Sequence, residues 1–340
     1  LVSVAVDPTT ATFAIDGGHG LGRLVDGGDV GDTYNWCPPD GDVEVDAPEP
    51  GTVSVALDEP GPLRGRLHIT ATYRWRNTPT NVRTTVELRA GERAVRVTHA
   101  FENRERDHRL RAWFALPAPA RVSRAECAFA VVERGLTAEG GPTELGLPTF
   151  PSRRFVQAGG LTLAHEGLLE YELVDIDDSG TAAHALALTL LRATGLLSQG
   201  PMDTRPLPAG PMDPAEAAQM QGPVEVRYAV AVGDDVDPYA LADDVFVPLV
   251  VTKAVGGGPL PTEGSALAVA GAEVSAVRRT AVGGPLEVRV FNPTAEPVAV
   301  TVAGHHGWLV DLRGRPIEPF EDTFVLGPWS IATLVLNPRQ

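Results

Sequence analysis

The chain has 340 residues, a length that predicts two or three domains, and 43% of them are hydrophobic, which is enough for a sizeable core. Asp and Glu outnumber Lys and Arg by 44 to 28, giving a formal net charge of −16. A field of that sign repels phosphate backbones and anionic surfaces, which argues against nucleic-acid and membrane partners.

Two features of the sequence bear on the cellular compartment of the protein and on whether the chain is part of a longer polypeptide. The cysteines, Cys37 and Cys127, are too few to staple a chain of this length and are typical of reduced residues in a cytoplasmic protein, with a single disulfide as the alternative. The chain begins at Leu1, without a methionine or a signal-peptide pattern, and is strand-like at once. We therefore expect a cytoplasmic protein and a piece of a longer polypeptide.

The first 200 residues consist of short strand-like runs separated by turn residues. Residues 89–93 predict a hairpin turn between two such runs. The runs with alternating apolar positions are 52–57, 66–75, 83–88, 94–101 and 110–116. Period-two patterning rich in Thr, Val and aromatic residues predicts antiparallel strands of a sandwich, so we expect an all-β fold.

Only one segment is a good helix candidate. Residues 184–192 are almost continuously apolar, which suits either a helix or a strand buried on both faces, and the β context favours the strand. Residues 238–244 predict a helix of about two turns, because Asp237 supplies an N-cap and Pro238 occupies the first helical position.

Two Pro- and Gly-rich breaks organise the rest of the chain. Residues 198–223 form a connection longer than compact domains usually allow without a function. A second break at 256–261 is typical of a linker. Four strand-like runs follow, at 286–291, 297–302, 307–311 and 330–336. We predict a large β-domain over 1–255, a linker over 256–262 and a small terminal β-sandwich over 263–340.

The most polar cluster is the loop at residues 25–39. It holds three carboxylates spaced by three residues, Asp26, Asp29 and Asp32, followed by Tyr34-Asn35-Trp36. Such a loop suits Ca²⁺ or sugar hydroxyls, although it lacks the EF-hand spacing. An acidic turn in water is the equally weighted alternative. Aromatic rings beside carboxylates and amides favour sugar recognition.

The sequence matches none of the common catalytic templates. No zinc-ligand spacing and no Gly-x-Ser-x-Gly is present, and the adjacent pair His305-His306 points to opposite faces if it lies on a strand. The remaining candidate imidazoles are more typical of core or turn residues than of an acid or base; they are His99, His108, His165 and His184. A glycosidase-type carboxylate pair cannot be located from the sequence.

Four motifs, in chain order, resemble bacterial α-mannosidases of glycoside hydrolase family 38. Residues 27–39 resemble the family's Gly-Asp-x-Gly-Asp-x-Tyr-Asn…Pro-Pro stretch, and 188–195 are similar to its Leu-Thr-Leu-Leu-Arg…Gly strand. Residues 205–219 are similar to an Arg-Pro…Ala-Gly-Pro segment followed by Pro-Glu-x-x-Gln, with one extra residue. Residues 291–333 resemble the family's small C-terminal sandwich. Together the motifs extend the resemblance over essentially the whole chain.

The resemblance implies that this chain is the C-terminal β-region alone, a galactose-mutarotase-like supersandwich followed by a small β-sandwich. Family members hold a zinc ion and an Asp nucleophile in an N-terminal α/β domain and hydrolyse terminal α-mannosides with retention. No stretch here matches the metal-binding motif. We therefore expect neither cofactor nor catalytic residue in this chain, zinc in the N-terminal domain of the longer enzyme, and no hydrolysis by this chain alone.

The resemblance also implies partners and site residues. The expected partners are the N-terminal catalytic domain of the same polypeptide and a mannose-containing oligosaccharide, and a homo-oligomer is left open. The expected residues of the cleft rim are Asp29, Asp32, Tyr34 and Asn35 from the first loop, with Arg205 and Gln219 from the connection. For Arg205, a buried structural salt bridge is equally weighted.

Two other functions stay open at this point. An autonomous carbohydrate-binding module would need an exposed platform of two or three aromatic rings. A mutarotase-like enzyme would need a His pair and a Glu base converging across a concave sheet. If the chain packs on a missing domain, the face that carries the Asp29–Trp36 loop is expected to expose apolar side chains.

Overall fold

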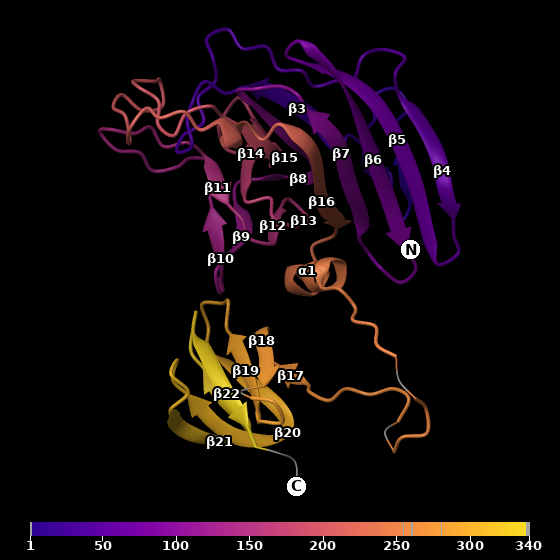
Figure 1. Ribbon diagram of the computed structural model, residues 1–340, viewed down its shortest axis with the longest axis vertical. Coiled ribbons are helices and arrows are strands. Elements are labelled where there is room, and N and C mark those ends of the chain that lie inside the picture. The colour runs from indigo at the N-terminus through magenta and orange to yellow at the C-terminus, as the bar shows by residue number, and fades with distance from the viewer. Residues whose placement is uncertain (1, 254, 260, 280, 338–340) are drawn as a thin grey trace. The chain divides into compact units, whose positions relative to one another are not determined.

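Nearly all regular structure in the chain is β-strand. The computed structural model describes residues 2–253, 255–259, 261–279 and 281–337 (Figure 1). The chain divides into two compact units: unit 1 is Leu1–Ala125 with Glu133–Val247, and unit 2 is Glu126–Val132 with Pro248–Gln340. The all-β prediction is confirmed, whereas the predicted domain boundaries stay a prediction.

The larger sheet, most of whose residues belong to unit 1, has nine antiparallel strands in the order β10-β9-β12-β13-β16-β7-β6-β5-β4. In β7, Val95–Asn103, buried residues alternate with more exposed ones, as the sequence pattern predicts. The predicted turn at 89–93 joins β6 to β7. The other strands are β4 (Ser54–Pro60), β5 (Arg64–Trp75), β6 (Thr78–Arg89), β9 (Ser123–Cys127), β10 (Ala130–Arg134), β12 (Phe155–Ala158), β13 (Leu161–His165) and β16 (Gly222–Val232).

A second sheet of unit 1 has five strands in the order β11-β14-β15-β8-β3. Its central strand β15, Ala183–Ala193, contains the apolar run that the sequence assigns to a strand, and nearly all of it is buried. The other members are β3 (Arg23–Gly28), β8 (His108–Ala120), β11 (Thr149–Pro151) and β14 (Glu170–Ile176). A separate hairpin pairs β1 (Val4–Val6) with β2 (Phe13–Ile15).

The core of unit 1 takes side chains from both sheets. Trp75 from the larger sheet is fully buried and packs edge-on against Phe101 at 5.2 Å between ring centroids. Phe114 from β8 packs in the same way against Tyr228 from β16, at 5.3 Å. Each such side chain contributes about 1.5–3 kcal/mol by burial, so the two faces are held together mainly by the hydrophobic effect.

The predicted helix is present as α1, Pro238–Phe246. The Asp237 side chain accepts hydrogen bonds from the backbone N–H groups of Tyr239 and Ala240, as an N-cap does. Arg96 donates to the carbonyl oxygens of Asp244 and Val245 and so satisfies the other end of the helix. A short 3₁₀ helix η1, Glu216–Gln219, was not predicted and lies in the long connection.

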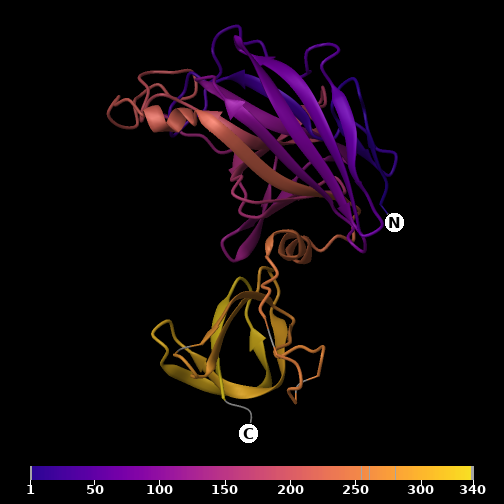
Figure 2. The same cartoon turned by 45° about the vertical axis from the view of Figure 1, so that its right-hand side comes forward.

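The connection predicted at 198–223 corresponds in the structure to residues 194–221, between the end of β15 and the start of β16, and the name refers to these residues from here on. It projects from one end of unit 1 in both views (Figures 1 and 2). The loops that follow β3 and β10 contact it through hydrogen bonds, as Thr33 N to Leu196 O and Leu145 N to Thr204 O. Three segments far apart in the sequence therefore meet at this end of the molecule.

Unit 2 holds one curved sheet of six strands around its own core. The strand order is β17-β20-β22-β19-β18, with β21 pairing with β20. The predicted strands 297–302 and 307–311 are in fact one strand, β20, with an irregular register between Thr301 and His306. The strands are β17 (Val269–Ala270), β18 (Glu273–Arg279), β19 (Leu286–Phe291), β20 (Val298–Val310), β21 (Pro316–Leu326) and β22 (Ile331–Leu336).

Candidate functional site

The loop after β3 is folded by its own carboxylates. Asp29 Oδ1 accepts from the backbone N–H groups of Gly31 and Cys37, and Asp32 Oδ1 accepts from those of Tyr34 and Asn35. Both aspartates are buried, so they serve as internal caps of the loop and do not project into water. Gly31 is required here, because a Cβ at this position would lie 2.0 Å from the carbonyl oxygen of Asn35.

Each of these carboxylates also pairs with a guanidinium from elsewhere in the chain. Arg192 of β15 donates from Nε to Asp29 Oδ2 at 2.7 Å. Arg205 of the connection pairs with Asp32 and also donates to the side-chain oxygen of Asn35 and to the carbonyl of Leu207. Two of the three carboxylates considered for Ca²⁺, Asp29 and Asp32, are therefore already paired with cations of the protein itself.

These pairs set the charge of the cluster. Burial raises the pKa of Asp32, but the hydrogen bonds from Arg205 and from backbone N–H groups outweigh burial and lower that pKa to about 2. Asp32 is therefore ionised at neutral pH, and the Asp32–Arg205 pair is a buried ion pair. At Asp29, burial is the largest effect and the pKa is raised, although Arg192 opposes the rise.

A third loop completes the site. Asn35 Nδ2 donates to Glu144 Oε1 at 2.6 Å, and Leu145 N donates to Thr204 O at 2.8 Å. Between these segments lies a groove of about 460 Å³, defined here as the loop groove. Its lining includes Tyr34, Asn35, Trp36, Gly140, Glu144, Thr149, Glu170 and Arg192.

The wall of the loop groove is held by a further ion-pair cluster. The buried Arg109 side chain lies 4.9 Å from the Trp36 ring centroid and donates to Glu170. Burial raises the pKa of Glu170, but Arg109 and the Thr189 hydroxyl outweigh it and lower the pKa, so Glu170 presents an ionised carboxylate. Carboxylates, an amide and two aromatic rings facing one polar groove are suited to binding a polyhydroxylated ligand.

The structure separates the six residues predicted for the cleft rim into three groups. Tyr34 and Asn35 line the loop groove. Asp29, Asp32 and Arg205 form the buried cluster behind it, the arrangement that the sequence left open for Arg205. Gln219 does not line the groove and instead binds Asp107 through both of its side-chain atoms.

Several residues of the groove escaped the sequence analysis. Glu144 lies in a Gly-Gly-Pro-rich stretch that carried no motif, and Glu170 lies on a strand more than 130 residues beyond the loop that it faces. The sequence signal of both was weak, since isolated charged residues are common. Trp36 and Arg192 were visible in the motifs at 27–39 and 188–195 but were not assigned to the rim.

The candidate histidines lie outside the loop groove. His99 bonds to Thr84 and Tyr228, and His165 bonds to Ser152, and burial lowers the pKa of both histidines to about 4. His108 pairs with Asp26 in the interior. Within the part of the chain that the structure describes, no group of three or more His, Cys, Asp or Glu side chains is arranged to hold a metal ion.

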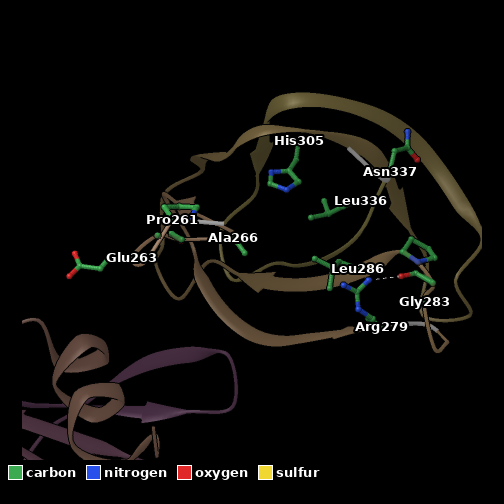
Figure 3. A pocket seen from close by; sticks show the side chains of 13 residues that line it. Pro261, Glu263, Ala266, Arg279, Gly283, Leu286, His305, Leu336 and Asn337 are labelled. Atoms are coloured by element: carbon green, nitrogen blue, oxygen red, sulfur yellow. Dashed lines mark hydrogen bonds between the residues drawn. The ribbon is translucent and has the colours of Figure 1, made fainter. Parts of the chain in front are cut away.

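A larger cavity, of about 660 Å³, lies in unit 2 (Figure 3). The His305 ring points into it, with Nδ1 bonded to the carbonyl of Ala303, and Arg279 donates to Gly284 O at its edge. Its lining side chains include aliphatic Leu286 and Leu336, and no Phe, Tyr or Trp lies among the described residues that line it. It therefore lacks the surfaces on which sugar rings stack, and the loop groove is the better candidate site.

Fold and site together define a two-unit β-protein with a polar, aromatic-bearing groove built from loops. No helix within the described ranges is long and apolar enough to cross a membrane. No protein-family model matches the chain.

Two solved structures have the same fold. An α-mannosidase from Enterococcus faecalis V583 superposes with a TM-score of 0.77 at 21% identity, over 99% of this chain and 41% of that one. A glycosyl hydrolase family 38 protein from Enterococcus faecalis gives a TM-score of 0.77 at 22% identity, over 99% of this chain and 43% of that one.

A sequence relative agrees with these structures. The chain is 28% identical over 242 residues to a predicted mannosylglycerate hydrolase from Halalkalibacterium halodurans, and the match covers 67% of this chain and 25% of the relative. The resemblance to the C-terminal β-region of bacterial family 38 α-mannosidases is thereby confirmed. The chain spans about a quarter of the length of this curated relative and about two fifths of the solved structures.

Proposed function

We propose that this chain is the non-catalytic β-region of an α-mannosidase-type glycoside hydrolase, and that its loop groove forms part of the rim of the sugar-binding cleft. The observation that carries the proposal is the groove itself, where Tyr34, Trp36, Asn35 and Glu144 face one polar space at the loop end of unit 1. The similarity to glycoside hydrolases, which extends over only a fraction of their length, supports the same view.

The proposed partner is the zinc-bearing catalytic domain of a longer cytoplasmic polypeptide, and the proposed substrate is a mannose-containing oligosaccharide. Several apolar side chains on the groove-forming segments are exposed by 43–59%, namely Val30, Tyr34, Leu145, Leu207 and Met212. Exposed apolar side chains on loops are what packing against a second domain requires.

The geometry supports a role in forming the rim of the sugar-binding cleft better than it supports a catalytic role. Glu170 is held ionised by Arg109, so it is a poor proton donor, and the described residues that line the groove include no histidine that could act as a base. The His pair that a mutarotase-like activity would need beside a Glu base is missing from the described residues that line the loop groove.

The test compares this chain with the complete polypeptide that contains it. We expect the complete polypeptide to hydrolyse an aryl α-mannoside and the chain alone to give no turnover. Titration of the chain alone with methyl α-mannoside and mannobiose forms the second arm. Turnover by the chain alone would contradict the proposal, and tight saturable binding without hydrolysis would favour an autonomous carbohydrate-binding module.

A further inference from the structure

We propose that His108 is a positioning residue that fastens the connection and the β3 loop to the sheets through one buried proton shared with Asp26. The proposal concerns how the loop groove is built, and it rests on the proposed function only for its relevance to sugar binding.

His108 lies where the two groove-forming segments leave the sheets. It is the first residue of β8 and is fully buried, as is Asp26 of β3, three residues before Asp29. His108 Nδ1 lies 2.6 Å from Asp26 Oδ1, and His108 Nε2 lies 3.1 Å from Asn103 Oδ1. Asn103 in turn contacts the end of the connection.

The orientation of the Asn103 amide decides which ring nitrogen carries a proton. Asn103 Nδ2 lies 3.2 Å from the carbonyl oxygen of Gln219 and 3.1 Å from that of Met220. Carbonyl oxygens only accept, so the amide nitrogen must face them. Asn103 Oδ1 accepts from Glu105 N at 3.1 Å and therefore also faces His108. His108 Nε2 must then be the donor, and it carries a proton.

A second proton is required on the other side of the ring. With Nε2 protonated, a neutral imidazole has only a lone pair at Nδ1, and Asp26 as a carboxylate has only lone pairs as well. A contact of 2.6 Å between them is a hydrogen bond only if one further proton lies between the two atoms. The pair therefore holds that proton and is neutral as a whole, which a fully buried pair requires.

The surroundings help the pair to keep this proton. The charged groups that face it are Arg76, which favours the carboxylate, and Glu105, which disfavours it. Burial is the largest effect at Asp26 and raises the pKa of its carboxyl, although the bond to His108 opposes the rise. Loss of the proton at high pH would leave two acceptors in contact and a buried negative charge.

Loss of the shared proton is expected to loosen one of the segments that form the loop groove. Burial, opposed by the bond to His108, leaves the pKa of the Asp26 carboxyl above its ordinary value, so the folded pair holds the proton more tightly than this carboxyl does in the unfolded chain. The stabilisation that this proton provides is therefore lost as the pH rises through the pKa of the folded pair. The part released first is the end of the connection, where Asn103 holds the two carbonyls.

The test is amide hydrogen exchange of the whole chain between pH about 6 and about 9, corrected for intrinsic exchange. We expect protection over 194–221 to fall about tenfold more in the wild type than in Asp26→Asn, whose amide can donate to Nδ1 without a shared proton. The matched control is Asp46→Asn, an exposed carboxylate that pairs with Arg23 and should behave like the wild type. An equal fall in all three proteins would overturn the proposal.

A measurement on the wild type alone covers the case in which Asp26→Asn does not fold. ¹⁵N spectra of the His108 ring should show Nε2 protonated throughout the range in which the chain is folded. A ring protonated at Nδ1 only would contradict the proton count. Neither readout involves sugar or hydrolysis, so failure of the proposed function would leave this result unchanged.

Discussion

Two long segments, the connection and residues 248–268, are both rich in Pro and Gly, but the described residues of the two segments have very different surroundings. In the connection, Arg205, Gln219 and Ser198 are buried, and Ser198 Oγ accepts from the N–H groups of Ala209 and Gly210. In the second segment Leu249, Val250 and Val251 are more than 90% exposed. Composition alone does not separate the two.

The difference shows what orders an irregular backbone. Backbone groups in a loop need partners, and in the connection buried polar side chains supply them. Two of those side chains are themselves tied to distant segments, Arg205 to Asp32 and Gln219 to Asp107. A Pro- and Gly-rich segment without such anchors gains little from packing.

Removal of the Arg205 side chain, which anchors the connection to Asp32, should lower the unfolding free energy more than any other change considered. Arg205→Ala leaves Asp32 buried and ionised without its partner, which typically costs about 3–5 kcal/mol of unfolding free energy. Urea denaturation of unit 1 measures the loss. The matched control is Arg93→Ala, which breaks an exposed pair with Asp235 and should cost less than about 1 kcal/mol. Equal losses would show that the Asp32–Arg205 pair is not an anchor.

A glycine substitution in the loop after β3 tests the next largest contribution to the unfolding free energy. Gly31→Ala brings a Cβ within 2.0 Å of the Asn35 carbonyl oxygen, so the loop must move, at a cost of about 1–3 kcal/mol. Gly135→Ala is the control, because a Cβ there meets no atom within 4 Å. Thermal unfolding of the two variants should differ clearly, and similar melting temperatures would contradict the account of the loop.

Much of this loop architecture could be predicted from the sequence, but not all of it. The Asp29–Trp36 loop was visible because carboxylates, glycines and aromatic residues cluster within a dozen positions. Helix α1 was visible because its cap and its proline are local signals. Glu144 and Glu170 were not found, because their role arises only when strands and loops distant in sequence come together.

Lowering the pH should reduce the unfolding free energy by a smaller amount, and gradually. Because the pKa of Asp32 is lowered to about 2 in the folded chain, its ion pair stabilises the fold above pH about 3.8, and this stabilisation is lost as the pH falls toward 2. The difference in unfolding free energy between the wild type and Asp32→Asn should shrink over that interval. A difference that does not depend on pH would mean that Asp32 is not ionised in the folded chain.

The smallest effect is expected in the exposed segment. Val250→Ser alters a side chain that is 91% exposed, so the unfolding free energy should change by less than about 0.5 kcal/mol. Denaturation midpoints equal to those of the wild type would support the contrast between the two segments. A loss similar to that of Gly31→Ala would show that residues 248–268 are anchored after all.

The most direct test of the central claim is steady-state kinetics of the complete polypeptide on an aryl α-mannoside, with Glu144→Gln compared with the matched surface variant Glu166→Gln. Glu144 lines the loop groove and accepts from Asn35, whereas the side chain of Glu166 is 57% exposed. If the groove forms the rim of the sugar cleft, kcat/KM should fall about tenfold for Glu144→Gln and stay unchanged for Glu166→Gln. Equal kcat/KM values for both variants, with the fold intact, would contradict the claim.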